Sequence, residues 1–98
     1  MSGACYFVTY DVGNARDEYQ VVKVLKRYGQ RYQYSVFCCD VDEKRLKALT
    51  MELQKVYTHR VQKEDTFRVA ILPMCSSCLA RRVEIGEPLN RQMGDIVI

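Results

Sequence analysis

The sequence predicts an α+β domain in which two helices cover one face of a mostly antiparallel sheet. Apolar residues recur at helical spacing over residues 15–28 and 43–57. Between and around them, residues 5–10, 31–41 and 66–72 are rich in β-branched and aromatic side chains, which is typical of strands. Helices that alternate with strands in a chain this short favour a two-layer arrangement.

The composition is typical of a single folded domain. The 98 residues suffice for one domain, and a hydrophobic content of 48% argues against disorder. No segment approaches the roughly 20 apolar residues of a membrane span, and the first residues lack the pattern of a secretory signal. Five cysteines, an odd number, are expected to be free thiols in a reducing compartment. We therefore expect a cytoplasmic protein with no membrane partner.

The first half of the chain carries clear local signals. Residues 5–10 are almost continuously apolar, as in a strand buried on both faces. Asn14 can cap the first helix, and Gly29 is expected to end it in a left-handed conformation. The buried stripe of that helix is predicted to be Val21, Val24, Leu25 and Tyr28.

A second strand and a second helix follow in residues 31–57. Residues 31–41 alternate as a strand, with a kink or bulge that divides it into two pieces. Asp42 can cap the second helix, and Pro73 is expected to end the following strand. The buried stripe of the second helix is predicted to be Leu46, Leu49, Leu53 and Val56.

This order of elements is that of the ferredoxin-like βαββαβ sandwich. Short strands around residues 82–85 and 95–98 would follow it. A two-layer fold leaves one sheet face bare and its edges free. We expect residues 1–80 to form the ferredoxin-like domain and residues 81–98 to pack on a partner subunit of a homodimer.

Asp11 is the strongest candidate for a functional residue. It follows the first strand directly and precedes the first helix, where a side chain can point out of the fold. One carboxylate binds Mg²⁺ poorly, so a metal site here needs a second carboxylate, a phosphate or a symmetry-related copy. The alternative is an aspartate that only stabilises a turn.

Several basic residues are candidates for a nucleic-acid surface. The net charge is +3, and Lys26 and Arg27 lie on the polar face of the first helix. Arg16 and Arg31 have the planar guanidinium that binds phosphate through two hydrogen bonds. Such contacts would weaken with salt. The alternative for each is a solvated surface residue.

Three further residues are predicted to support the site. Tyr10 is expected to pack in the core. Ser35 and Phe37 share one face of the predicted strand, so Phe37 is expected in a dimer interface and Ser35 within hydrogen-bonding reach of the Asp11 region.

The pair Cys75 and Cys78 has the spacing of a zinc, copper or redox site, but a tight turn with two thiols is the favoured interpretation.

Several of these motifs together resemble one known family. They are Tyr10-Asp11-Val12, the basic helix that ends in Tyr28-Gly29, Arg31, residues 33–37, the strand over 67–72, the two cysteines Cys75 and Cys78, and residues 94–98. In this order they resemble the second of the two universal CRISPR adaptation proteins, a family of small CRISPR-associated endonucleases. The resemblance covers essentially the whole chain.

The resemblance implies a homodimer whose two sheets face each other. Asp11 of each subunit would then face a shared Mg²⁺ or Mn²⁺ ion. It implies a metal-dependent endonuclease that hydrolyses phosphodiester bonds in RNA or DNA during spacer acquisition. The alternative is a non-catalytic dimer that bridges DNA for the CRISPR integrase. A thiol-based metal carrier using Cys75 and Cys78 is a third hypothesis.

Overall fold

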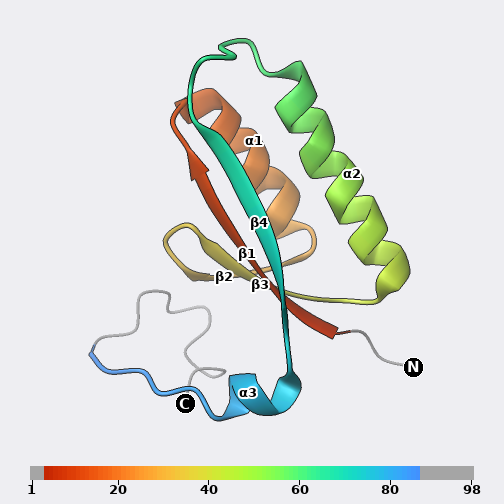
Figure 1. Ribbon diagram of the computed structural model, residues 1–98, viewed down its shortest axis with the longest axis vertical. Coiled ribbons are helices and arrows are strands. Elements are labelled where there is room, and N and C mark those ends of the chain that lie inside the picture. The colour runs from red at the N-terminus through yellow and green to blue at the C-terminus, as the bar shows by residue number, and fades with distance from the viewer. Residues whose placement is uncertain (1–3, 87–98) are drawn as a thin grey trace.

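The computed structural model describes residues 4–86, and their architecture is the expected ferredoxin-like βαββαβ sandwich. The elements are β1 (Ala4–Val12), α1 (Ala15–Lys26), β2 (Gly29–Gln33), β3 (Val36–Val41), α2 (Glu43–His59), β4 (Phe67–Met74) and α3 (Ser76–Ala80). The four strands form one antiparallel sheet in the order β2-β3-β1-β4. The helices α1 and α2 lie together on one side of it (Figure 1). None of the helices in this part of the chain is long and apolar enough to cross a membrane.

The core lies between the sheet and these two helices. It contains Val8, Tyr10, Val21, Val24, Leu25, Phe37, Cys39, Val41, Leu49 and Leu53. Successive side chains of a strand point to opposite faces. Since Val8 and Tyr10 face the helices, Thr9 and Asp11 lie on the other face. We call this second face, which carries Cys5, Phe7, Thr9 and Asp11 of β1, the open face.

Both helix caps are confirmed. The Asn14 side chain accepts hydrogen bonds from the backbone N–H groups of Arg16 (3.0 Å) and Asp17 (3.2 Å). Asp42 accepts one from the backbone N–H of Arg45 at 2.8 Å. These bonds satisfy donors that a helix leaves unpaired in its first turn. Both helices therefore begin where the sequence predicted.

The role predicted for Gly29 is wrong. Helix α1 ends at Lys26, and Gly29 opens β2 without a left-handed conformation. Glycine is needed there because the strands approach closely. A Cβ atom at this position would lie 2.8 Å from the Cys39 Cα and closer still to the Cys38 carbonyl oxygen. The cause is therefore lack of space beside β3.

Residues 31–41 form a hairpin. A two-residue turn, Tyr34 and Ser35, joins β2 to β3, and Ser35 has a positive φ of 71°. The pairing also shifts register between Arg31 and Gln33, so the predicted bulge is present as well. A positive φ is uncommon for a residue other than glycine, and here the two-residue turn places Ser35 in that conformation.

Three predictions about the C-terminal half need correction. Pro73 lies inside β4, opposite Tyr6, and does not end the strand. Proline is tolerated there because β4 is an edge strand with one paired side. Cys75 caps a short helix, α3, in place of the predicted tight turn. Residues 82–85 form no strand in the described chain, and the strand predicted at 95–98 lies outside the described residues.

Candidate metal and nucleic-acid site

Asp11 lies on the open face where β1 ends. Its side chain is 71% exposed, and one of its oxygens, Oδ2, lies 3.9 Å from Nη1 of Arg68. Arg68 is the residue opposite Asp11 in the β1–β4 pairing and is itself 78% exposed. A long ion pair between two exposed groups holds neither side chain firmly. The carboxylate oxygens of Asp11 are therefore accessible to a further ligand.

The residues around Asp11 fit one half of a metal site. Among residues 4–86, no three His, Cys, Asp or Glu side chains converge on a point that could hold a metal ion. Proteins usually hold Mg²⁺ through one or two carboxylates, with waters and substrate phosphates as the other ligands. One protomer supplies the first carboxylate of such a set. A shared site needs the second from another molecule.

Tyr10, Arg31 and Phe37 form a cluster on the helix side of the sheet. Nη1 of Arg31 donates a hydrogen bond to the Tyr10 hydroxyl oxygen at 3.1 Å. The Arg31 guanidinium also lies 5.1 Å from the centre of the Phe37 ring, a cation–π distance. Tyr10 is buried, as predicted. Arg31 is thus half-buried on the helix side of the sheet, and the structure does not bring it to the open face, which carries Asp11.

The placement predicted for Phe37 is wrong. The side chain is 1% exposed within a single protomer and belongs to the core, so it cannot pack on a partner subunit. The physical reason is the register between β3 and β1. Phe37 pairs with Val8, whose side chain faces the helices, and paired residues share one face of a sheet.

Ser35 acts through its backbone. It lies in the turn, so its side chain does not share a strand face with Phe37, and that part of the prediction is wrong. Its carbonyl oxygen accepts a hydrogen bond from the backbone N–H of Tyr10 at 3.0 Å. The turn thereby fixes the backbone of β1 next to Asp11.

The predicted basic residues do not form one patch. Arg16 and Lys26 are exposed, but they lie at opposite ends of α1. Ten residues of helix separate them by about 15 Å along the axis. One basic residue of the set, Arg27, is already paired: both of its terminal nitrogens donate to the carboxylate of Glu52 on α2.

The pairing of Arg27 joins the two helices. Hydrogen bonds from Arg27, and then from the Tyr28 hydroxyl, hold the pKa of Glu52 below its usual value. Arg45 of α2 also donates to the backbone carbonyl of Arg27 at 3.1 Å. Arg27 therefore has a structural contact in this protomer, whereas Arg16 and Lys26 present exposed charge.

An apolar hollow runs along the outer edge of the sheet. It has a volume of about 410 Å³ and lies between α2 and β4. Its lining includes Leu53, Tyr57, Phe67 and Ile71, together with Arg68. The edge of β4 beside this hollow pairs with no other described strand.

The fold and the exposed strand-end carboxylate define a class: a ferredoxin-like α+β domain with an acidic residue at the tip of its first strand. Within this class, the family model described as CRISPR associated protein Cas2 matches residues 4–82. The chain belongs to this family, and the resemblance drawn from its motifs is confirmed.

Individual relatives agree. The chain is 33% identical to the CRISPR-associated endoribonuclease Cas2 1 of Methanospirillum hungatei, over 87% of this chain and 88% of that protein. It is 31% identical to the CRISPR-associated endoribonuclease Cas2 3 of a Synechocystis species, over 95% and 97%. The crystal structure of Streptococcus pyogenes Cas2 at pH 6.5 matches with a TM-score of 0.61 and 29% identity, covering 85% of this chain and 99% of that one.

Proposed function

We propose that this chain is a metal-dependent endonuclease of the CRISPR spacer-acquisition machinery that hydrolyses phosphodiester bonds as a homodimer. The observation that carries the proposal is the position of Asp11, exposed on the open face with its oxygens accessible. Two relatives named as endoribonucleases support the reaction class and favour RNA as the first substrate to test. The five free thiols suit the reducing cytoplasm, where we expect the protein to act.

The open face is a suitable surface for a two-fold dimer. It presents Leu72, which is 47% exposed, directly opposite Phe7 in the β1–β4 pairing. A symmetric contact places the same patch of both subunits together. Two Asp11 carboxylates brought close in this way repel each other unless a cation lies between them.

Each side chain then has a distinct task. The paired Asp11 carboxylates would hold the ion, and Mg²⁺ or Mn²⁺, when bound, polarises a phosphate and lowers the pKa of a water. Arg68 neighbours Asp11 and can bind the phosphate of the substrate through its guanidinium. Arg16 and Lys26 would hold the nucleic-acid backbone farther from the point of cleavage.

A cleavage assay tests this function. Purified full-length protein is incubated with single-stranded RNA, single-stranded DNA and duplex DNA, in Mg²⁺, in Mn²⁺ or with a chelator. We expect cleavage of at least one substrate with metal and its complete loss with chelator, because the ion supplies the polarisation. Cleavage that survives chelation, or no cleavage of any substrate, would contradict the proposal. The preferred substrate decides between RNA and DNA.

The second candidate is a non-catalytic dimer that bridges DNA for the integrase subunit. The exposed charges of Arg16 and Lys26 favour it, since they lie about 15 Å apart on one helix and suit contacts to a DNA backbone better than a compact active site. In this case the integrase performs the chemistry, and Asp11 is dispensable for spacer acquisition.

Charge reversal measures the DNA contact. We expect Lys26→Glu to weaken duplex binding at least about tenfold near physiological salt and to flatten the salt dependence of the affinity. The matched control is Lys55→Glu, an exposed lysine of α2 outside the proposed surface. Binding and spacer acquisition are measured for both variants. Equal losses in the two would show a general effect of charge and remove Lys26 from the interface.

A further inference from the structure

Two thiols that the proposed nuclease does not use lie at the start of α3. Cys75 occupies the N-cap position of this helix without a capping hydrogen bond from its side chain, Cys78 lies three residues later, and both are exposed. The backbone N–H of Leu79 donates to the Cys75 carbonyl at 3.0 Å, so this first turn is α-helical. An N-cap side chain lies beside the residue three positions later at the start of a helix. The Cys78 thiol is within hydrogen-bonding reach of the Cys75 sulfur. The two thiols are therefore neighbours on the protein surface.

Cys75 has the chemical surroundings of a reactive thiol. Its sulfur lies 3.0 Å from the hydroxyl oxygen of Ser77. Hydrogen bonding from the Ser77 hydroxyl, and then from the backbone N–H groups of Cys78 and Ser77 and from the Cys78 thiol, favours the thiolate and lowers the pKa of Cys75 to about 7. A large fraction of Cys75 is thus nucleophilic at neutral pH.

Cys38 and Cys39 of β3 are poorer nucleophiles than Cys75. Cys5 and Cys38 lie close together, with their sulfurs 3.2 Å apart, but burial raises the pKa of Cys38 to about 12. Burial likewise raises the pKa of Cys39 to about 11. Protonated thiols of this kind react slowly at neutral pH. A reaction would therefore start from Cys75 and not from Cys38 or Cys39.

A metal site is a poorer explanation of the pair. Structural zinc requires four ligands. No third His, Cys, Asp or Glu converges on a metal-binding arrangement with these thiols within residues 4–86. Two adjacent thiols with one poised as a thiolate suffice, however, for thiol–disulfide exchange.

We propose that Cys75 and Cys78 form a redox-active dithiol that reacts with low-molecular-weight disulfides such as glutathione disulfide. The Cys75 thiolate attacks one sulfur, the S–S bond of glutathione disulfide breaks, and one glutathione thiolate leaves. Cys78 then loses its proton and attacks the Cys75 sulfur, which releases the second glutathione thiolate. The two protein thiols supply two electrons, and the two departing thiolates take up the protons.

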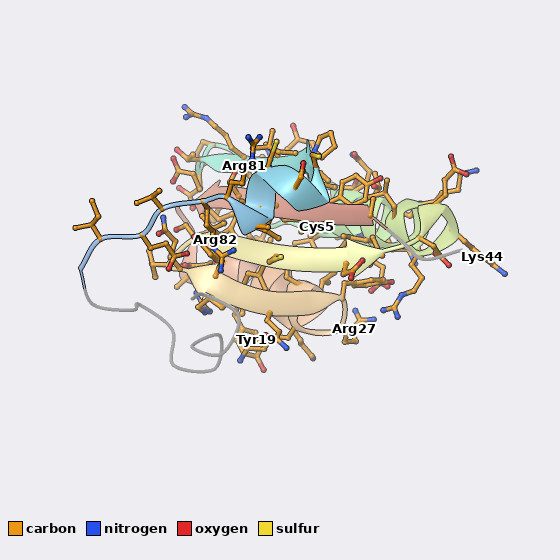
Figure 2. All side chains as sticks on the ribbon, turned by 90° about the horizontal axis from the view of Figure 1, so that it is seen from below. Cys5, Tyr19, Arg27, Lys44, Arg81 and Arg82 are labelled. Carbon is orange, nitrogen blue, oxygen red and sulfur yellow. The ribbon has the colours of Figure 1, made fainter. Side chains whose placement is uncertain are left out.

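The location gives this exchange a structural consequence. Helix α3 connects β4 to residues 81–86, and Figure 2 shows Arg82 where the chain leaves the helix. Arg82 and Glu84 pair with each other at 2.8 Å, and the Tyr32 hydroxyl of β2 donates to Glu84. A disulfide would close a covalent ring in the turn from which this segment departs. The dithiol is thereby placed to stiffen the connection between the sheet and the C-terminal segment.

Alkylation tests the reactivity of Cys75 in the full chain. Iodoacetamide labelling is followed by peptide mapping between pH 5 and 10. We expect Cys75 to react at least about tenfold faster than Cys78 and Cys38 at pH 7, with a rate midpoint near pH 7. Labelling of Cys75 at the same rate as Cys78, or a midpoint near that of a free thiol, would overturn the proposal.

Glutathione buffers test the exchange itself. The test uses a Cys5→Ser/Cys38→Ser background, which removes the other close pair of thiols. We expect the mass of the oxidised protein to fall by two hydrogens and the disulfide to map to Cys75 and Cys78. Adding Cys78→Ser should stop the reaction at a stable mixed disulfide on Cys75, and adding Cys75→Ser should leave Cys78 largely unmodified. The proposal fails if no disulfide forms in this background or if the Cys78→Ser variant carries no glutathione.

Discussion

Replacing Asp11 by asparagine is expected to lower metal-dependent cleavage by at least about 10²-fold, because a metal ion supplies several kcal/mol of transition-state stabilisation. In the proposed homodimer the substitution would remove both carboxylates of the shared site at once, whereas the amide would preserve their size. The fold should be unaffected. Asp11 is 71% exposed, and its one ion pair, with Arg68, is 3.9 Å long. Initial cleavage rates and Mn²⁺ binding are measured on the same preparations.

Asp40→Asn is the matched control for Asp11. Asp40 is an exposed aspartate of β3, and it shares the open face because its neighbours Cys39 and Val41 belong to the core. This variant should cleave normally. Undiminished cleavage by Asp11→Asn would exclude the carboxylate from the reaction. Loss of the dimer in Asp11→Asn would instead assign the residue a structural role.

Truncating Phe37 to alanine is expected to reduce the free energy of unfolding by about 3–5 kcal/mol. The ring is almost completely buried, 6.3 Å from the Tyr10 ring and beneath the guanidinium of Arg31. Its removal leaves a cavity that neighbouring side chains fill only in part. Since small domains have a total stability of about 5–15 kcal/mol, much of it would be lost. Urea unfolding followed by circular dichroism measures the change.

The variant Leu72→Ala tests the contribution of the open face to dimerisation, apart from the contribution of the core to protomer stability. Leu72 is 47% exposed in the protomer, so its truncation should change protomer stability far less than that of Phe37. If the open faces pair, it should weaken dimerisation, which sedimentation at several concentrations detects. The opposite pattern, with Phe37→Ala well folded but monomeric, would contradict the burial of Phe37.

The sequence predicted those elements whose signals are local. Asn14 and Asp42 cap the helices through bonds to residues two or three positions away, so the caps are visible in the sequence itself. The hairpin was different. Its turn depends on Ser35 adopting a positive φ, and a non-glycine residue gives little warning of that conformation. The face of Phe37 was hidden as well, because it depends on the register that pairs this residue with Val8 of β1.

In the candidate site, too, the sequence predicted the local features and missed the contacts between distant segments. The exposure of Asp11 follows from its place at the end of a strand, which the sequence reveals. Its neighbour Arg68 was missed because only the register between β1 and β4 brings the two together. The contact of Arg27 with Glu52 was equally hidden, since it depends on how α1 packs against α2. Pairings between distant segments have no signature in a single sequence.

The tight fit of Gly29 against β3 affects how an alanine scan of this chain should be interpreted. A methyl group at that position would meet the Cα and the sulfur of Cys39, each at 2.8 Å. The Cα belongs to backbone that cannot rotate aside as a flexible side chain can. Position 29 would therefore score as essential for every property assayed, nuclease activity included, although glycine brings no chemical group to any of them. Position 29 requires a residue without a side chain, because atoms of Cys38 and Cys39 already occupy the adjacent space.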